Sequence, residues 1–474
     1  MTPDEFRALG YKIIDWIAEY RETVEPRRVM SHETPGAVRA KLPASPPVDP
    51  EPFERILADL ESIVLPGITH WSHPSFFAYF PSNTSLSAVL GDLLASGLGV
   101  QCMSWQTSPA GTELEEAMMD WLRQMLGLPD AFRGAIQDTS SNATFVAMLC
   151  ARERASGDAR LGGGLQSIEA PLTVYTSDQA HSSVEKAVLL AGIGQEQFRS
   201  IETDGRYAMR VDALRARLEE DVRAGKKPCA IVATVGTTAT TASDPLRPIA
   251  ELAREYGAWL HVDAAMAGIA MIAPECREHW AGIDEVDSIA VDPHKWLGTG
   301  MHLSAYYVRD ASYLTRVMST QPHYLRTAAD DKVTNFRDWG ISLGRRFRAL
   351  KLWCLLREQG TSGLVARIRR DLANAKWLEA EVRKTEGWEV VAPVPFQTVC
   401  VRHVPRHLGG MRDEDALNAH NLAWADRIND GGKAYLTSTV VAGRRIVRVS
   451  VGAEATELSH VKKLWELMQE TAGS

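Results

Sequence analysis

Between about Leu86 and Leu352, short apolar runs of strand length alternate with longer runs that have helical periodicity. Such alternation predicts an α/β fold, with a mostly parallel sheet covered by helices. At 474 residues, the chain also exceeds the length at which one hydrophobic core usually stops growing. We therefore expect more than one structural unit. The strands predicted in this region are 172–175, 230–234, 259–262, 288–291 and 303–308.

The N-terminal region has its own helical pattern. Thr2 as N-cap, Pro3 at the first helical position and Glu5 reaching back to the cap predict a capping box. Prolines cluster between residues 26 and 52 and predict an extended linker before a second helix at 53–64. The first helix carries an apolar stripe that needs a partner surface, made of Phe6, Leu9, Ile13, Ile17 and Tyr20.

These patterns predict three parts: an N-terminal helical arm over residues 1–85, a large domain over 86–352, and a small α+β domain over 353–474. For the last part we predict strands at 399–404, 434–441 and 446–451, a helix within 413–429, and a final helix from Glu457.

Composition narrows the class of partner. The chain has 52 basic and 60 acidic residues, a net charge of −8, and no long basic run, which argues against nucleic acid or an anionic membrane surface. No apolar run approaches the roughly 20 residues of a membrane span, and the N-terminus starts a helix, so a cytoplasmic protein is expected. The six cysteines are far apart without a Cys-x-x-Cys pair, so neither a metal site nor a disulfide framework is predicted. A small-molecule partner is expected.

The strand at 288–291 ends at residues that carry chemistry. Pro293 lacks a ladder donor and pushes Asp292 toward an extended conformation, so the strand is expected to stop there. His294 and Lys295 are then presented on the exit loop, where open α/β sheets bind their ligands. The other interpretation of Lys295 is a surface charge beside a turn.

A second strand, at 259–262, runs into Asp263. An acid and an amine that face one cleft suit pyridoxal phosphate. The amine forms a Schiff base with this cofactor, and the carboxylate keeps the ring nitrogen protonated so that the ring acts as an electron sink. Asp263 and Lys295 therefore predict a pyridoxal-phosphate site.

Three motifs make this prediction specific: His294-Lys295-Trp296, the run 261–265, and the run 178–183. They resemble the group II pyridoxal-phosphate decarboxylases, in particular the aromatic-L-amino-acid decarboxylases. The resemblance covers nearly the whole chain. Further stretches that match in order and spacing are 77–81, 104–105, 108–109, 112–115, 119–122 and 343–348.

The resemblance implies a fold-type I pyridoxal-phosphate-dependent transferase fold, a homodimer whose N-terminal arm wraps over the other subunit, and pyridoxal 5'-phosphate as cofactor. From the residues alone, the arm could equally pack onto its own large domain. It implies that Lys295 binds the cofactor beside His294, that Asp263 contacts the ring nitrogen, that His181 stacks on the ring, and that Thr238 lies next to it. Without the resemblance, His181 would be interpreted as a structural histidine and Thr238 as a turn residue.

The phosphate is expected at the helix that follows Thr139, Ser140 and Ser141, because helix N-terminal amides and the dipole attract anions. An ordinary helix cap is the alternative. The resemblance assigns Ser140 and Ser141 to the phosphate. Asp138 stands where many relatives have glycine and Asp292 where many have asparagine, so each adds a negative charge near a dianion.

Tyr324 lies in the segment 320–343, which lacks a sustained helical or strand period and is predicted to be a lid. In the resembled enzymes, the tyrosine at this place protonates the α-carbon after carbon dioxide has left. The alternative is a loop tyrosine that anchors the segment by its ring.

At the substrate end, the resemblance assigns an aromatic wall and several neighbours. Methionine accommodates many shapes and a buried glutamine needs a hydrogen-bonding partner, so a polar or aliphatic substrate stays open. The residues assigned to the substrate are Trp71, Tyr79, Phe80, Pro81, Ser82, Gln101, Met103 and Met301.

The function predicted is pyridoxal-phosphate-dependent decarboxylation of an L-amino acid to its amine, with catalytic roles for Lys295, Asp263, His181 and Tyr324. An aromatic substrate is the first choice: DOPA, 5-hydroxytryptophan, tryptophan, tyrosine or phenylalanine. The alternatives are an aromatic aldehyde synthase, a decarboxylase of an aliphatic or polar amino acid, and a non-catalytic scaffold. A phenylalanine at the loop position would have favoured the aldehyde synthase, and Tyr324 argues against it.

Overall fold

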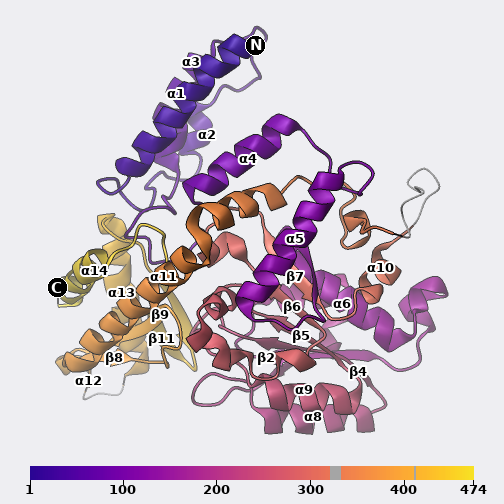
Figure 1. The fold of residues 1–474 in the computed structure, drawn as a ribbon. Coiled ribbons are helices and arrows are strands. Elements are labelled where there is room, and N and C mark those ends of the chain that lie inside the picture. Colours follow the sequence, from indigo (N-terminus) through magenta and orange to yellow (C-terminus); the bar gives the residue numbers. More distant parts are fainter. Residues whose placement is uncertain (321–331, 410–412, 474) are drawn as a thin grey trace. The chain divides into compact units, whose positions relative to one another are not determined.

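The computed structural model describes residues 1–320, 332–409 and 413–473 (Figure 1). Contacts group the chain into two compact units. The terminal unit comprises Met1–Pro81, Asn374–Val391 and Val399–Ser474, and the central unit comprises Ser82–Ala373 and Ala392–Thr398.

The central unit is built on a seven-stranded sheet with the order β1-β7-β6-β5-β4-β2-β3. Strands β6, β5, β4, β2 and β3 are parallel, whereas β7 is antiparallel to both β6 and β1, which confirms the mostly parallel sheet. The strands are β1 Arg133–Gln137, β2 Leu172–Ser177, β3 Phe198–Ile201, β4 Lys227–Thr234, β5 Trp259–Asp263, β6 Ser288–Val291 and β7 Ser304–Val308.

All five strands predicted for this region are present within a few residues, because each is an apolar run buried on both faces. The strands β1 and β3 were missed. Strand β1 begins with an exposed arginine and a glycine, and β3 is a four-residue strand with alternating exposure at the edge of the sheet. Neither has the continuous apolar run by which the others were recognised.

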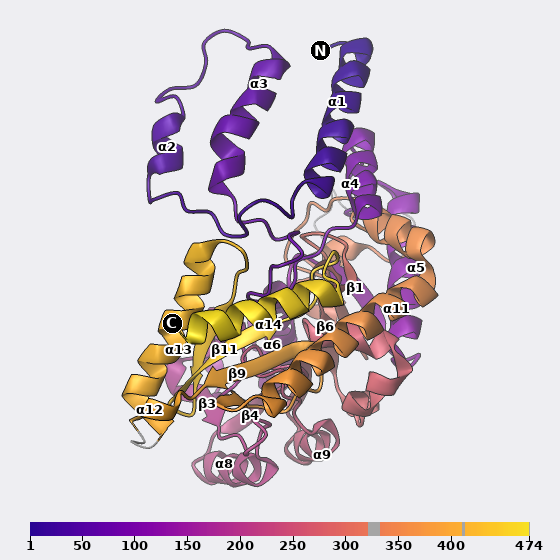
Figure 2. The same cartoon turned by 90° about the vertical axis from the view of Figure 1, so that its left-hand side faces the viewer.

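Helices pack against this sheet, and α8 and α9 lie together in both views (Figures 1 and 2). Helix α11 contains Gly360 at φ 63° and ψ 165°, which breaks its helical path. The helices of the central unit are α4 Leu86–Leu98, α5 Pro109–Leu126, α6 Ser140–Ser156, α7 Ser182–Leu190, α8 Val211–Arg223, α9 Leu246–Tyr256, α10 Ser312–Met318 and the first part of α11 Ala349–Lys384.

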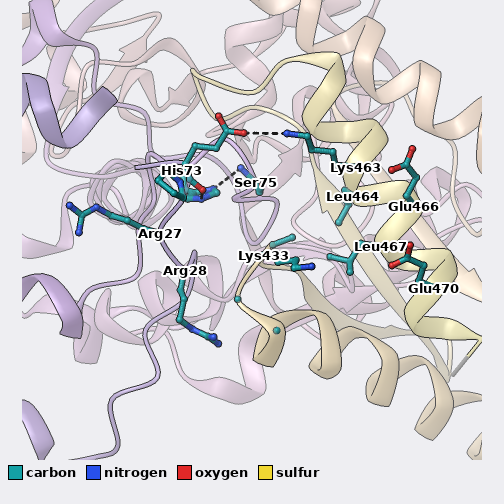
Figure 3. Close-up of a pocket in the computed structure, with 15 residues that line it drawn as sticks. Arg27, Arg28, His73, Ser75, Lys433, Lys463, Leu464, Glu466, Leu467 and Glu470 are labelled. Carbon is teal, nitrogen blue, oxygen red and sulfur yellow. Dashed lines mark hydrogen bonds and ion pairs between the residues drawn. The ribbon is translucent and has the colours of Figure 1, made fainter. Parts of the chain in front are cut away.

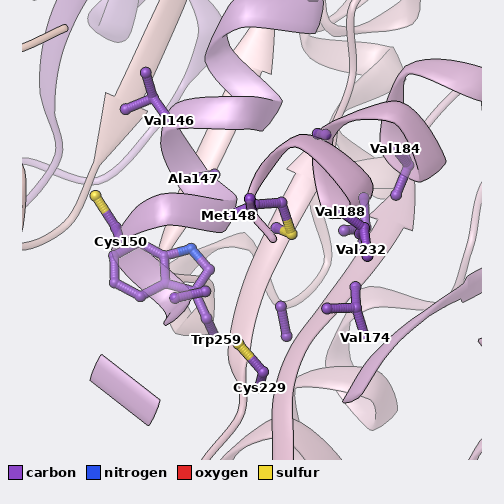
Figure 4. Packing of buried hydrophobic residues seen from close by; sticks show 14 of the residues in the cluster. Val146, Ala147, Met148, Cys150, Val174, Val184, Val188, Cys229, Val232 and Trp259 are labelled. Atoms are coloured by element: carbon purple, nitrogen blue, oxygen red, sulfur yellow. The ribbon is translucent and has the colours of Figure 1, made fainter. Parts of the chain in front are cut away.

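A large cluster of buried hydrophobic residues lies between α6, α7 and the sheet (Figure 4). Val146 and Met148 of α6, Val188 of α7, and Val232 and Trp259 of the sheet belong to one buried cluster. The indole N–H of Trp259 donates to Ser288 Oγ at 2.8 Å, so its polar atom is satisfied inside the core. This packing fixes the position of α6 on the sheet.

The terminal unit contains a four-stranded sheet of order β10-β11-β9-β8, with α13 packed on β11 and on α14 (Figure 2). The predicted strands and helices are present here, and the three-residue β8 was missed because its sequence is too short to show a period. The elements are β8 Trp388–Val390, β9 Thr398–His403, α12 Arg406–Gly409, α13 Glu414–Gly431, β10 Thr437–Val441, β11 Arg444–Ser450 and α14 Leu458–Ala472.

The same unit includes the N-terminal helices α1 Pro3–Glu22, α2 Ala37–Lys41 and α3 Phe53–Asp59, the last continued by a π-helical turn. The predicted capping box of α1 is present: Thr2 N donates to Glu5 Oε2 at 2.6 Å, and Glu5 N donates to Thr2 Oγ1 at 3.2 Å. None of the residues of α1 is buried, and Phe6 is 59% exposed. The apolar stripe of α1 is therefore incompletely covered within the chain.

In the part of the chain that the structure describes, no helix combines the length and the apolar character needed to cross a membrane.

A buried ion pair ties α8 to the edge of the central sheet. Arg199 of β3 donates from Nε and Nη2 to the two carboxylate oxygens of Asp221, each at 2.8 Å, and Tyr175 of β2 donates its hydroxyl proton to Asp221 at 2.9 Å. Arg199 and Asp221 are almost fully buried, so neither charge is solvated once its partner is lost. Strand β2 leads directly to His181, so this contact also supports the site.

We expect Arg199→Ala to lower the free energy of unfolding by about 3–5 kcal/mol, because it leaves Asp221 as a buried charge without its main partner. The matched control is Arg217→Ala. This side chain lies 3.8 Å from the same carboxylate but is 38% exposed, so its loss is expected to cost less than about 1 kcal/mol. Denaturant midpoints of the two variants measure the difference. Equal decreases in the free energy of unfolding would show that the Arg199–Asp221 pair does not stabilise this edge of the sheet.

Candidate active site

The turn that carries Lys295 follows β6 as Pro293 predicts. Asp292 is extended at φ −106° and ψ 91°, and the helical turn Pro293–Leu297 begins after it. Gly298 ends this turn at φ 99°, where its N–H donates to Pro293 O at 2.9 Å. This left-handed conformation suits glycine, and it closes the turn immediately after Trp296 and Leu297.

Helix α11 holds this turn through Trp296. The indole N–H of Trp296 donates to Asp371 Oδ2 at 2.9 Å, and both side chains are completely buried. Burial raises the pKa of Asp371 to about 6, although Arg370 opposes the shift. Asp371 was not predicted from the sequence, because an aspartate inside a charged helical segment gives no signal of such a role.

Lys295 forms an ion pair with Asp292. Its Nζ lies 3.0 Å from Asp292 Oδ2, and His294 Nε2 lies 3.6 Å from the same oxygen. Burial acts to raise the pKa of Asp292, but the charge of Lys295, together with hydrogen bonds from Ser304 and Ser140, outweighs it, so the pKa is lowered and the group is a carboxylate. The Lys295 side chain is 27% exposed, whereas Asp292 is buried, so the amine remains accessible to a ligand.

The second acid, Asp263, ends the neighbouring strand β5 and pairs in register with Ala290 of β6. It is 5% exposed, and its Oδ1 accepts a hydrogen bond from Ala265 N at 3.1 Å. Burial raises the pKa of Asp263, and the charge of Lys295 acts against that shift. Lys295 is thus within electrostatic reach of two buried carboxylates.

The N-terminus of α6 lies at the same edge of the sheet. Strand β1 is antiparallel to β7, and β7 is antiparallel to β6, so β1 and β6 point the same way. Thr139 caps the helix by accepting from Asn142 N at 3.4 Å, which is the role of an ordinary N-cap. Ser140 is buried and donates its hydroxyl proton to Asp292 Oδ1 at 2.7 Å, while Ser141 is exposed.

Both extra acids at this helix are paired. Asp138 forms an ion pair with Arg348, whose Nη2 also donates to Ile136 O at 3.3 Å. Asp292 is paired with Lys295. The sequence pattern identified the two negative charges but not Arg348 as a partner, since the two segments are 210 positions apart.

The other two predicted ring contacts follow β2 and β4, which are neighbours in the sheet. His181 is the N-cap residue of α7, where its Nδ1 accepts from Ser183 N at 3.1 Å. Thr238 is exposed on the loop after β4, in which Gly236 and Thr237 both donate to Ala242 O at 2.9 Å. Parallel strands end at one edge, so these loops leave the sheet where Asp263 and Lys295 do.

The donor set fits pyridoxal phosphate. An accessible amine, a buried carboxylate on the adjacent strand, and a helix N-terminus with a buried hydroxyl are the groups that this cofactor's aldehyde, ring nitrogen and phosphate require. Lys295, Asp263 and Ser140 would hold these three parts.

Four of the residues predicted at the substrate end belong to the central unit. Ser82 and Met103 are half-buried, and Met301 is 53% exposed. Gln101 is exposed, and its side-chain oxygen accepts from Arg345 N at 2.7 Å. The hydrogen-bonding partner expected for Gln101 is therefore a backbone group of this chain.

The aromatic residues predicted at the substrate end lie together in the terminal unit, with Pro81 buried beside them in sequence. The rings of Trp71 and Tyr79 stack at 5.6 Å with an interplanar angle of 18°. Tyr79 adopts a left-handed backbone at φ 49° and its hydroxyl lies 3.3 Å from that of Tyr435. Tyr435, which the sequence did not single out, thus extends this aromatic group.

Phe80 is covered by Arg448, whose guanidinium lies 5.0 Å from the ring centroid and donates to Tyr79 O at 3.1 Å. Arg448 is nearly completely buried on β11. An arginine inside a strand gave no signal in the sequence, because its contact partner is 369 positions away.

The predicted proton donor Tyr324 lies outside the described residues.

A separate pocket of about 460 Å³ lies within the terminal unit (Figure 3). Glu25 bridges to Lys463 at 3.4 Å, and Ser75 N donates to His73 Nδ1 at 2.9 Å. None of the residues that line this pocket is among those predicted to bind cofactor or substrate. The pocket is therefore distinct from the site around Lys295.

Comparison with known proteins agrees with this geometry. The profile of the pyridoxal-dependent decarboxylase conserved domain matches residues 35–404. A phenylacetaldehyde synthase from a Rosa hybrid cultivar is 40% identical over 100% of this chain and 94% of its own length. A tryptophan decarboxylase from Camptotheca acuminata is also 40% identical, over 100% of this chain and 95% of its own.

The crystal structure of the Oryza sativa protein designated TDC, with PLP and tryptamine, superimposes with a TM-score of 0.96 at 40% identity and covers 100% of this chain and 98% of that one. The match extends over the entire length of this chain. The chain therefore belongs to the pyridoxal-dependent decarboxylase family, with the fold-type I architecture, and is a carboxy-lyase that uses pyridoxal 5'-phosphate.

Proposed function

We propose that the protein decarboxylates an aromatic L-amino acid to the corresponding amine and carbon dioxide. The observation that carries the proposal is the placement of Lys295 beside two buried carboxylates, Asp263 and Asp292, at the strand ends that meet the N-terminus of α6. Relatives named tryptophan decarboxylase and tyrosine decarboxylase, each about 40% identical over the whole chain, support an aromatic substrate.

Each residue of the site has a separate task in this proposal. The bound cofactor supplies an electron sink for the electrons left when carbon dioxide departs. Lys295 holds the cofactor covalently and releases it to the substrate amine. Asp263 keeps the ring nitrogen protonated, His181 covers the ring, and Ser140 with Ser141 and the α6 N-terminus binds the phosphate.

The substrate side chain is proposed to contact the aromatic group of Trp71, Tyr79 and Phe80. Flat apolar rings favour an aromatic substrate through stacking and through burial of apolar area. The side-chain oxygen of Gln101 already accepts from Arg345 N, so the amide N–H groups are what it can offer to a substrate. Ser82, Met103 and Met301 complete the proposed contacts, and methionine adapts to the shape of the ring system.

Tyr324 decides between two reactions in this proposal. As proton donor it delivers a proton to the α-carbon after carbon dioxide has left, so the product is an amine. When that proton is not delivered, molecular oxygen can attack the same carbon, and water then releases aldehyde, ammonia and hydrogen peroxide. Because phenylacetaldehyde synthases are among the relatives, this second reaction is the alternative function.

We expect Lys295→Ala to abolish steady turnover, because no amine remains to hold the cofactor or to release the product. Borohydride reduction of the holoenzyme followed by peptide mass spectrometry should attach the cofactor to Lys295 in the native protein and not in the variant. Lys227→Ala, at an exposed lysine that begins β4, is the control and should keep both properties. Full activity of Lys295→Ala would reject the assignment.

For Tyr324→Phe, we expect amine formation in air to fall at least tenfold while aldehyde and peroxide rise, since the ring is kept and only the proton donor is lost. The amine-to-aldehyde ratio, measured in air and under argon by mass spectrometry, reports this change. Tyr11→Phe, at an exposed tyrosine of α1, should leave the ratio unchanged. If Tyr324→Phe also leaves the ratio in air unchanged, Tyr324 is not the donor and His181 becomes the candidate.

The protein is proposed to act as a homodimer. Helix α4 exposes an apolar stripe with the helical spacing i, i+4, i+7, i+8 and i+12, and each leucine in it is 48–61% exposed. Helix α1 also leaves its apolar stripe incompletely covered. Contiguous apolar surface of this kind marks an association surface. The leucines of α4 are Leu86, Leu90, Leu93, Leu94 and Leu98.

Light scattering is expected to report about twice the chain mass of 52.2 kDa. The double variant Leu90→Glu/Leu94→Glu should shift the protein toward the monomer, because it places two charges on the proposed interface. Leu190→Glu, at an exposed leucine of α7, should leave the mass unchanged. An active monomeric native protein would contradict the dimer.

A further inference from the structure

Asp292 is hydrogen-bonded to Ser140, a hydroxyl that is proposed to bind the cofactor's phosphate. Its Oδ1 accepts the hydroxyl proton of Ser140 at 2.7 Å, and Ser140 is the buried hydroxyl at the N-terminus of α6. A phosphate bound at this helix end would approach the same hydroxyl as an acceptor. Two anionic acceptors would then face one donor.

The groups around Asp292 determine how its charge can be compensated. From its own turn, Lys295 Nζ lies at 3.0 Å and His294 Nε2 at 3.6 Å. Three neighbouring elements add further groups. Helix α6 contributes the hydroxyl of Ser140, β7 contributes the hydroxyl of Ser304, and β5 contributes Asp263, whose carboxylate would carry the same negative charge as Asp292.

Of these neighbours, Lys295 is the cation that balances Asp292. Burial lowers the pKa of His294, so this ring is neutral near pH 7. Covalent attachment of the cofactor would engage the nitrogen of Lys295 in a bond to the aldehyde carbon, with release of water, so that Asp292 would no longer face a free ammonium group. The same event brings in a phosphate that carries about −1.5 to −2 charges.

We infer that Asp292 and the cofactor's phosphate compete for Ser140, and that Asp292 takes up a proton from solvent when the phosphate binds. The protonated carboxyl then donates where the carboxylate had accepted, and the repulsion between the two anions is removed. The inference rests on the proposed position of the phosphate at α6. Because Asp292 takes up a proton on binding, the affinity for the phosphate decreases as the pH rises. Asp292 therefore influences how tightly the cofactor is bound.

The test uses cofactor-free protein and two probes, pyridoxamine 5'-phosphate and pyridoxamine, which have the same ring and amine and cannot form the bond to Lys295. The ratio of the two dissociation constants isolates the contribution of the phosphate. We measure it by fluorescence titration from pH 7 to 8.5, where the phosphate is already a dianion because its second pKa is about 6. The proteins compared are the native chain, Asp292→Asn and Asp292→Ser.

For the native protein, the preference for the phosphorylated probe should decrease by up to about tenfold per pH unit, which is the dependence for uptake of one proton. In the two neutral variants the preference should be independent of pH and at least tenfold larger at pH 8. A flat profile in the native protein overturns the inference, as does an unchanged preference in a folded neutral variant. The native profile remains decisive if neither variant folds.

Ser140→Ala separates this inference from the proposed function. If this variant loses preference for the phosphorylated probe while the neutral Asp292 variants match the native protein, the phosphate site stands and the inference fails. If Ser140→Ala keeps the full preference, the Ser140 hydroxyl does not bind the phosphate, and the role proposed for Ser140 and the inference both fail.

Discussion

The ion pair between Lys295 and the buried Asp292 is the interaction on which the site depends. A buried carboxylate without a partner lowers the stability of the fold, so the ion pair with Lys295 holds both side chains at the end of β6. The same carboxylate accepts from Ser140 and thereby connects the lysine to the start of α6. One acid thus positions both the amine and the start of α6.

The fold brings these groups together through strand direction. Strands β1, β5 and β6 point the same way, so α6, Asp263 and the Lys295 turn meet at one edge of the sheet although they are far apart in sequence. Packing of α6 on Trp259 and its neighbours fixes the helix, and the hydrogen bond from Trp296 to Asp371 fixes the turn from the side of α11. The site is therefore built on rigid elements, which is what precise placement of a cofactor requires.

Much of this arrangement could be predicted from local sequence. Pro293 marked the end of β6, the apolar runs marked β5 and β6, and Asp263 and Lys295 at the ends of these two strands indicated the cofactor. The missed features depend on contacts that no local pattern contains. Asp371, Arg348 and Arg448 act on partners 75, 210 and 369 positions away. Strands β1 and β3 are short or partly exposed, so they lack the apolar run by which buried strands are recognised.

Product analysis of the holoenzyme tests whether the protein decarboxylates an aromatic amino acid to its amine. Each of the twenty amino acids, with DOPA and 5-hydroxytryptophan, is supplied with a labelled carboxyl group, and mass spectrometry records labelled carbon dioxide together with the amine or aldehyde formed. We expect amine from one or more aromatic substrates, with labelled carbon dioxide in equal amount and little product from aliphatic or acidic ones. Preferential decarboxylation of an acidic or aliphatic amino acid, or aldehyde as the main product, would contradict it.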